Sequence, residues 1–218
     1  MPVLRLNGPY IWVTWLTKLL IGTNSCEWAS WFRAQHESGS WDKVPSTFDW
    51  DAWRIEHTAL LGTIRQQLEM EGKTVFTEKQ NSFTLQGKTA ALGGQPDLIA
   101  ISGSRGTILD AKAGAPHPSH SMQVKLYMYA APRALRQYSG MTFDGKLVYK
   151  DHEIPIPSSA INGTFIKNLS ELIRRIASSN PAVKVPSPVE CKFCNITQTD
   201  CPDRVAEDTI EGEETSDF

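Results

Sequence analysis

The sequence has 218 residues, of which 40% are hydrophobic and 21% are charged, and a chain of this size can bury a substantial core without help from disulfides. The formal net charge of −2 hides an asymmetry, because residues 203–218 carry seven acids against one arginine and leave a weakly basic body of 21 bases and 17 acids. This balance is compatible with a nucleic-acid partner but does not identify one. The acidic segment itself is expected to be disordered.

The sequence also excludes the membrane-spanning and secreted classes. No stretch is apolar enough to span a bilayer. The candidate targeting segment, residues 10–22, is interrupted by Lys18 and is followed by no small-residue cleavage pattern. We therefore expect a soluble cytoplasmic protein, in which thiols stay reduced. Four cysteines in such a compartment indicate a metal site before they indicate disulfides.

The N-terminal part is predicted to be a helical layer. All seven tryptophans fall in the first quarter of the chain, and their recurring three-residue spacing favours burial on helices over stacking against nucleic-acid bases. One helix is predicted to end at Leu20 and a second to span 26–36. A longer helix is predicted from Asp49 or Asp51 to just before Gly72. Its inward face follows steps of three and four residues, at Trp53, His57, Leu60, Ile64 and Leu68.

After Gly72 the pattern changes from helix to strand. Alternating apolar residues between Gly- and Asn-containing turns predict strands at 74–78, 82–85, 97–101 and 107–112. A helix is then predicted over 121–135, and a hairpin or edge strand over 145–154. The region 158–178 contains a further helix, and 181–188 is a proline-rich linker. The apolar face of that further helix is Phe165, Leu169, Leu172 and Ile176.

The segment from Asp97 to Lys112 is predicted to be a hairpin that carries two opposed acids. Centring its Gly-rich turn near Ser104 places Asp97 opposite Asp110, with Cβ atoms about 5 Å apart on one face. Lys112 points to the same face, because it follows Asp110 by two residues. Two carboxylates this close repel each other unless a positive group lies between them. Mg²⁺ or Mn²⁺ together with Lys112 would provide that charge, as metal-assisted phosphodiester hydrolysis requires. A surface hairpin with incidental acids is the alternative.

This hairpin resembles a known family. The pattern Pro96-Asp97, a hydrophobic strand, and then Asp110-Ala-Lys112 is similar to the signature of the PD-(D/E)xK nucleases. The resemblance implies that Asp97, Asp110 and the main-chain carbonyl of Ala111 hold the catalytic metal. It also implies that Lys112 positions or deprotonates the attacking water.

Two further elements resemble the RecB-like branch of this family. His57, on the helix before the hairpin, would join the two acids as a metal ligand, although a core histidine is the alternative. Gln123 and Tyr127, on the helix after it, resemble the QxxxY motif and would hold the DNA backbone near the metal. Ordinary helix packing is the alternative for both. Glu78 resembles an auxiliary acid of some family members.

The four cysteines indicate a second metal site. Cys191 and Cys194 form a CxxC pair, and Cys201 follows after six residues. Three thiols at this spacing imply a metal, and Cys26 is the expected fourth ligand because no other cysteine exists. Such a site would clasp the two ends of the chain together. Four thiolates fit either tetrahedral Zn²⁺ or an iron–sulfur cluster.

The arrangement of one remote and three clustered cysteines resembles the iron–sulfur nucleases, namely AddB-type domains and the CRISPR-adaptation exonucleases. The ending Cys201-Pro-Asp-Arg204 is similar to theirs, whereas the six-residue gap before Cys201 is one residue longer than their usual spacing. The resemblance implies a structural [4Fe–4S] cluster, with Zn²⁺ as the alternative.

These observations predict an α/β fold in which a mixed central sheet is flanked by helices, as in restriction endonucleases, with a helical N-terminal layer and a C-terminal cysteine clasp. We expect one RecB-like nuclease domain over residues 1–202. Within it, 1–48 and 181–202 form the clasp and 49–180 the nuclease core. Residues 203–218 are the acidic tail.

The predicted activity is that of a Mg²⁺- or Mn²⁺-dependent deoxyribonuclease, an exonuclease on single-stranded or free-ended DNA. By resemblance it processes DNA for CRISPR adaptation, a form of antiviral defence, with a CRISPR integrase complex as partner. The alternatives are a DNA-repair or phage nuclease, a catalytically idle module that binds DNA or a partner, and an iron–sulfur redox protein. The sequence does not indicate digestion polarity or oligomeric state.

Overall fold

A computed structural model describes residues 1–205 of the chain. By its internal contacts the chain divides into two compact units. The first unit comprises Met1–Asp49, Gly87–Ala91 and the described part of Asn168–Phe218, and the second comprises Trp50–Gln86 and Leu92–Lys167. The predicted acidic tail lies almost entirely outside the described residues. None of the helices within 1–205 is both long enough and apolar enough to cross a membrane.

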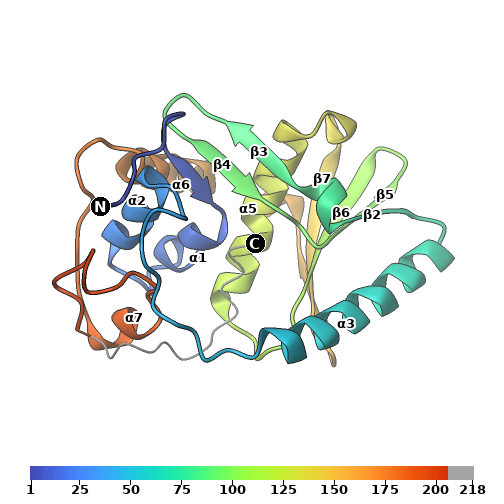
Figure 1. Cartoon of the computed structure of the whole chain (residues 1–218). Helices are drawn as coiled ribbons and strands as arrows, with labels where there is room; N and C mark the ends of the chain where they lie inside the picture. Colours follow the sequence, from blue (N-terminus) through green and yellow to red (C-terminus); the bar gives the residue numbers. More distant parts are fainter. Residues whose placement is uncertain (206–218) are drawn as a thin grey trace. The chain divides into compact units, whose positions relative to one another are not determined.

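The first unit contains the N-terminal helices and the cysteine-bearing C-terminal segment (Figure 1). Its centre is the buried cluster of Trp28, Phe32 and Ile196, so the second helix packs against the loop that precedes Cys201. The elements of this unit are β1 (Tyr10–Trp12), α1 (Thr14–Leu20), α2 (Glu27–Gln35), the C-terminal part of α6 (Gly163–Ile176), and α7 (Pro188–Lys192).

The second unit is built around a mixed five-stranded sheet in the order β2-β5-β6-β7-β8. Only β6 and β7 run parallel, and the other neighbours are antiparallel. The predicted α/β class with a mixed sheet is therefore confirmed. The strands are β2 (Thr74–Thr77), β5 (Leu98–Ser102), β6 (Arg105–Ala111), β7 (Thr142–Val148) and β8 (Glu153–Ile156); β3 (Phe83–Gln86) and β4 (Ala91–Gly94) are neighbours in a smaller sheet.

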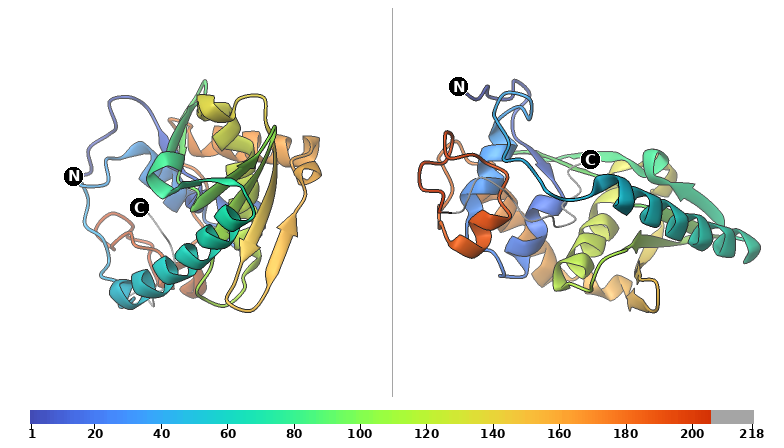
Figure 2. Two further views of the ribbon diagram at one scale, coloured as in Figure 1. Left: turned by 90° about the vertical axis from the view of Figure 1, so that its right-hand side faces the viewer. Right: turned by 60° about the horizontal axis from the view of Figure 1, so that its bottom comes forward.

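Two helices cover opposite faces of the five-stranded sheet (Figure 2). α3 (Trp50–Met70) packs Ile64 and Leu68 against a core cluster that includes Leu109. α5 (Pro118–Ala134) lies over Gly145, which pairs with Ile108 on the face opposite to that of Leu109. The shorter helices are α4 (Glu78–Asn81) and two 3₁₀ turns, η1 (Arg136–Tyr138) and η2 (Ser158–Ala160).

The predicted helices and strands are present, with shifts at their ends. The helix predicted from residue 121 begins at Pro118, because proline suits the first turn and the His117 side chain accepts a hydrogen bond there. The strand predicted over 74–78 ends at Thr77, whose capping box with Gln80 starts α4 at Glu78. The segment 145–154 is the hairpin of β7 and β8. The strands β1 and β4 and the helix α7 were not expected.

Gly145 allows α5 to lie close to the sheet, and its replacement by alanine is expected to destabilise the protein. A Cβ atom at this position would lie 2.5 Å from Val124 Cγ1 and 2.7 Å from Met128 Sδ. Such overpacking costs about 1–3 kcal/mol of unfolding free energy, which urea denaturation would measure. The control is Gly62→Ala in α3, where a Cβ atom meets nothing within 4 Å and helix propensity favours alanine. Equal stability of the two variants would contradict this packing.

Candidate active site

The two acids of the predicted motif lie at one end of the hairpin formed by β5 and β6. Ser102 pairs with Arg105 across a two-residue turn, and the register runs unbroken to Leu98 opposite Leu109. Extending this register by one residue places Asp97 opposite Asp110. The turn is therefore centred where the sequence predicts it, and both carboxylates emerge on one face of the sheet.

Asp97 connects the hairpin to α3. Its Oδ2 atom accepts a hydrogen bond from the main-chain N–H of Ala111 at 2.7 Å and lies 3.4 Å from Nε2 of His57. The buried His57 ring stacks on Trp53, with 4.6 Å between the ring centroids. Burial disfavours the charged imidazolium, but the hydrogen bond to Asp97 and the negative charge of Asp97 hold the pKa of His57 above its ordinary value.

Lys112 lies between Asp110 and α5. Its Nζ atom is 3.0 Å from Oδ2 of Asp110 and donates a hydrogen bond to Oε1 of Gln123 at 3.2 Å. Gln123 in turn donates from Nε2 to Oη of Tyr127 at 3.0 Å. All four side chains are buried. The structure thus joins the Asp-x-Lys motif to the Gln and Tyr of the predicted QxxxY motif in one polar chain.

Tyr127 is held tightly by its neighbours. Its ring meets the edge of Phe83 at a centroid distance of 6.2 Å. A Cβ atom added to Gly94 would lie 2.9 Å from the Tyr127 ring and 2.7 Å from that of Phe83, so glycine at this strand position makes room for the tyrosine. Burial raises the pKa of Tyr127. The phenol therefore stays protonated and acts as a hydrogen-bonding group rather than as a base.

Asp110 is the most deeply buried acid of the site, with 1% of its surface exposed. Burial raises the pKa of Asp110 to about 6, against the opposing charge of Lys112. Apart from the ion pair with Lys112, the Oδ2 atom has no hydrogen-bond partner within the described chain. A buried carboxylate oxygen of this kind retains lone pairs that a cation can take up.

The donor set suits a hard divalent cation. Within residues 1–205, no group of three or more His, Cys, Asp or Glu side chains is arranged to hold a metal ion. Mg²⁺, however, usually takes only one or two carboxylates and completes its octahedron with waters and substrate phosphates. Asp97, Asp110 and the carbonyl of Ala111 fit that requirement, and His57 lies beside Asp97 as a further nitrogen donor.

In metal-free protein, the free energy of unfolding is expected to fall as the pH rises through about 6. The folded state binds the Asp110 proton more tightly than the unfolded chain, where the ordinary pKa is 3.8. The stabilisation from this proton is therefore complete below the pKa of Asp110 in the unfolded chain and is lost above its pKa in the folded protein. The free energy of unfolding changes by an amount on the order of 3 kcal/mol. Denaturation in EDTA from pH 4.5 to 7.5 measures most of this change. Asp110→Asn should lack this component, and identical pH profiles of the two proteins would contradict the assignment.

The four cysteines lie in the first unit, and their thiols are free. Cys26 precedes the first residue of α2, Cys191 lies in α7, and Cys194 and Cys201 follow it. All but Cys191 pack against the aromatic cluster at the centre of the unit. Burial raises the pKa of Cys201, and the other three thiols lie close enough to raise it further. Because these thiols do not form a metal-holding group as they stand, the cluster stays a prediction.

Two charged side chains hold the cysteine segments in place: Glu190, for which the sequence suggests no role, and Arg204, which ends the Cys-Pro-Asp-Arg pattern. The carboxylate of Glu190 accepts hydrogen bonds from the main-chain N–H groups of Ser25 at 2.9 Å and Cys26 at 3.0 Å. The buried Arg204 donates to the carbonyl of Cys194 at 2.6 Å. A capping box would direct the Glu190 side chain to the N–H of Ser187, so no local pattern indicates its contact with Ser25 and Cys26. The Cys-Pro-Asp-Arg pattern includes Arg204 but does not indicate its contact with Cys194.

Glu78 and two histidines near the start of α5 have local contacts. Glu78 opens α4, and its main-chain N–H donates to the carbonyl of Asp97 at 2.9 Å, so its backbone adjoins the site. His117 accepts a hydrogen bond from Ser119 N–H at the start of α5. His120 Nδ1 lies 2.9 Å from the hydroxyl of Tyr149.

Comparison with known proteins places the chain in a family. A family model described as PDDEXK_1, PD-(D/E)XK nuclease superfamily, matches residues 25–199. That span contains every residue of the acidic site and three of the four cysteines. No curated protein matches the chain. A solved structure titled "Crystal structure of SSO0001" is 17% identical, with 90% of this chain and 88% of that chain covered and a TM-score of 0.43.

Proposed function

Because the chain belongs to the PD-(D/E)XK nuclease superfamily, we propose that it is a metal-dependent deoxyribonuclease whose active centre is the acidic end of the β5–β6 hairpin. Membership of the superfamily suggests a nuclease in general. The observation that carries the specific proposal is the convergence of Asp97, Asp110 and Lys112 at one end of a single hairpin, next to Gln123 of α5.

The side chains of this site would divide the chemistry among them. A bound Mg²⁺ or Mn²⁺ would supply Lewis-acid stabilisation of the phosphate and a more acidic bound water. Asp97, Asp110 and the carbonyl of Ala111 would hold the ion, with His57 joining them. Lys112 would position the attacking water and stabilise the charge that develops on the phosphate oxygens.

Gln123 and Tyr127 would keep the side chain of Lys112 in place. Gln123 accepts from Lys112 and donates to Tyr127, whose ring is fixed by Phe83. Precise orientation of a charged group is a large part of catalytic power. The two residues would therefore act on Lys112, in addition to any contact with the DNA backbone.

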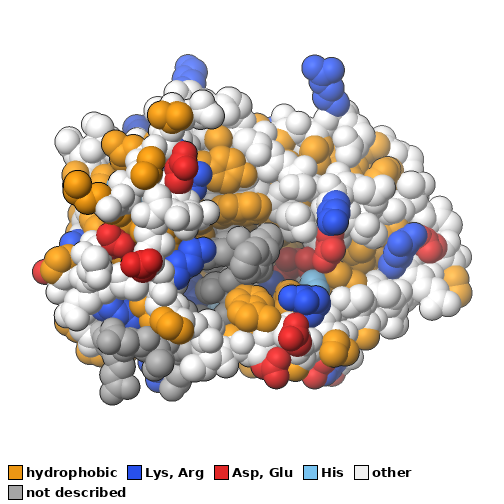
Figure 3. All heavy atoms as spheres, viewed as in Figure 1, with side chains coloured by type: hydrophobic (Ala, Val, Ile, Leu, Met, Phe, Trp, Pro, Cys, Tyr) orange, Lys and Arg blue, Asp and Glu red, His pale blue; other side chains and the backbone are white. Residues whose placement is uncertain are grey.

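We extend the proposal to exonuclease action on single-stranded or free-ended DNA in CRISPR adaptation, beside an integrase complex in the cytoplasm. Its support is the resemblance of Gln123, Tyr127 and the cysteine layout to the iron–sulfur members of the RecB-like branch. Surface charge does not favour one kind of nucleic acid over another, because Lys and Arg side chains are interspersed with Asp and Glu on the face seen in Figure 3. Repair and phage nucleases of this branch would share the same site.

The test is incubation of anaerobically purified protein with end-labelled single-stranded, end-labelled double-stranded and circular single-stranded DNA. Each substrate is incubated with Mg²⁺, Mn²⁺ or EDTA. We expect cleavage with either metal and none in EDTA, and we expect linear single strands to be degraded while circles are spared. Cleavage of circles would identify an endonuclease. Binding of DNA without cleavage under every condition would favour the idle binding module.

A further inference from the structure

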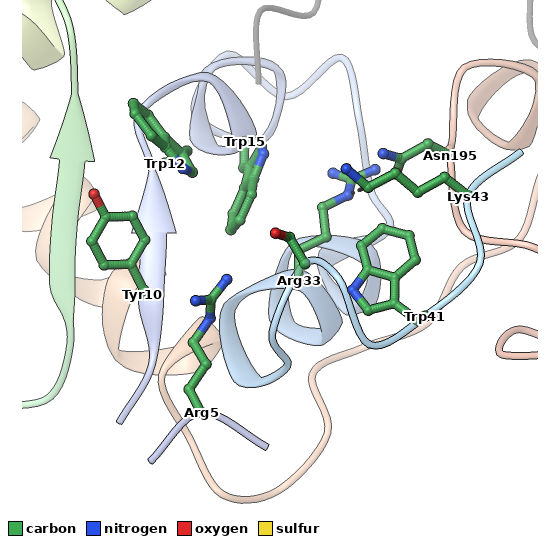
Figure 4. Close-up of a pocket in the computed structure, with 9 residues that line it drawn as sticks. Arg5, Tyr10, Trp12, Trp15, Arg33, Trp41, Lys43 and Asn195 are labelled. Carbon is green, nitrogen blue, oxygen red and sulfur yellow. Dashed lines mark hydrogen bonds between the residues drawn. The ribbon is translucent and has the colours of Figure 1, made fainter. Parts of the chain in front are cut away.

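The first unit contains a pocket of about 350 Å³ that is lined by aromatic and basic side chains. Figure 4 shows that the aromatic lining comes from Tyr10, Trp12, Trp15 and Trp41. The volume lies at the lower end of the range of about 300–1,000 Å³ that is usual for small-molecule pockets. The acidic residues described above belong to the other unit, so this pocket is a separate feature of the chain.

The rings on one side of the pocket project from regular structure. In β1, Ile11 is fully buried and its two neighbours are only partly buried, so Tyr10 and Trp12 share the opposite face of the strand. Their ring centroids are 6.0 Å apart with an interplanar angle of 70°. Trp15 follows from the first turn of α1. These tryptophans therefore differ from Trp28, which is buried in the core of the unit.

Arg5 brings a partly desolvated positive charge to these rings. Its guanidinium carbon lies 5.6 Å from the centroid of the Tyr10 ring, and in Figure 4 the guanidinium extends toward the aromatic side of the pocket. The Nε atom is buried and has no hydrogen-bond partner among residues 1–205. Burial lowers the pKa of Arg5, although Glu37 opposes this effect. An anionic group in the pocket would offset this desolvation.

Two more basic residues line the other side. Arg33 donates from Nε to Oδ1 of Asn195 at 3.0 Å, and its guanidinium lies 6.0 Å from the ring of Trp15. Lys43 Nζ lies 5.6 Å from the ring of Trp41, whose own buried Nε1 atom has no hydrogen-bond partner in the described chain. None of the described residues that line the pocket is acidic.

This composition selects the chemistry of the ligand. A cationic ligand is disfavoured, because cations already lie over the rings and no lining acid would neutralise another one. A purely apolar ligand would make no use of the three positive charges in the lining. A flat aromatic ring joined to a phosphate uses both features, since bases stack on indole rings and phosphates pair with Arg and Lys.

We propose that this pocket binds one nucleotide of a single-stranded DNA, with the base against the indole rings and its two flanking phosphates toward Arg5 on one side of the pocket and Lys43 on the other. The choice of DNA rests on the proposed nuclease function, whereas the nucleotide chemistry rests on the pocket itself. The protein would then bind single-stranded DNA through this pocket without the metal.

The test is fluorescence anisotropy in EDTA with a labelled oligothymidine of about ten nucleotides and with an abasic oligomer of the same length. We expect the oligothymidine to bind at least about fivefold more tightly than the abasic oligomer, because stacking of one base contributes at least that factor. Trp12→Leu should reduce the affinity for oligothymidine by a similar factor. Arg5→Gln and Lys43→Gln should each lower the slope of log affinity against log salt by about 0.7.

The matched controls are Lys88→Gln, at an exposed position of the same unit, and Trp50→Leu in α3. Both should bind as the wild type does. Arg5→Gln leaves the aromatic lining intact and serves as the main variant if Trp12→Leu does not fold, as circular dichroism would show. Equal binding of base-containing and abasic oligomers, or unchanged binding by folded pocket variants, would overturn the proposal.

The two proposals can fail separately, because binding is measured without metal. If the protein cleaves DNA and the pocket variants bind normally, only the pocket proposal is wrong. If the pocket variants lose affinity while no DNA is cleaved under any condition, only the nuclease proposal is wrong.

Discussion

Replacement of Asp110 by asparagine is expected to lower the rate of metal-dependent DNA cleavage at least about 100-fold, the effect of removing one strong electrostatic group from an active site. The amide has nearly the shape of the carboxylate but lacks its charge, so it binds a divalent cation poorly. Lys112 would also lose its ion-pair partner at 3.0 Å. Single-turnover cleavage of labelled single-stranded DNA at saturating protein measures the effect without a contribution from product release.

Lys112→Gln should reduce the same rate by a similar factor, while Mn²⁺ binding is retained. The control is Asp151→Asn. Asp151 is an exposed acid of the same unit, and its carboxylate lies 2.7 Å from Nδ1 of the neighbouring His152. That variant should cleave DNA at the wild-type rate. Folding of each protein is checked by its denaturation midpoint. Full activity of a folded Asp110→Asn variant would show that the metal lies elsewhere.

The second large effect concerns the cysteines, which we propose hold a structural [4Fe–4S] cluster. Cys26→Ser is expected to lose most of its iron and the broad absorbance near roughly 400 nm, and to lose several kcal/mol of stability, because the cluster would join distant parts of the chain. Glu190 already binds the main-chain N–H of Cys26, so the backbone is placed for this ligand. Iron analysis of anaerobically purified protein, absorbance and denaturation together measure the change.

Ser25→Ala is the matched control for this variant. Ser25 adjoins Cys26, and the contact between Ser25 and Glu190 uses the main-chain N–H, so the alanine variant should keep its iron. A colourless wild-type protein with stoichiometric zinc would overturn the iron–sulfur proposal and support the alternative four-thiolate zinc site. A protein in which Cys26→Ser changes neither metal content nor stability would contradict a role for this cysteine as a ligand.

The acidic hairpin could be predicted because the residues that determine it are close together in the sequence. The turn at Gly103 and Ser104 fixes the register of the two strands, and the register alone opposes Asp97 to Asp110. The inward face of α3 could be predicted in the same way, since helical periodicity places His57 on the side of Ile64 and Leu68, and all three are buried.

Other features depend on contacts that no local pattern contains. β4 ends in Gly93 and Gly94, a pair that is typical of a turn in a sequence. In the structure Gly94 lies in the strand, where the rings of Phe83 and Tyr127 occupy the space that a side chain would need. The hydrogen bond from Lys112 to Gln123 needs the helix to fold back over the sheet. Periodicity also treats the tryptophans alike, whereas in the structure Trp28 is core and Trp12 lines a pocket.

The most direct test of the acidic metal site is a crystal structure of the protein soaked in Mn²⁺, with an anomalous difference map. The expected result is a peak within coordinating distance, about 2.0–2.6 Å, of the carboxylates of Asp97 and Asp110, and no such peak in Asp110→Asn crystals. A wild-type protein that cleaves DNA with Mn²⁺ but places the ion away from both carboxylates would contradict the account.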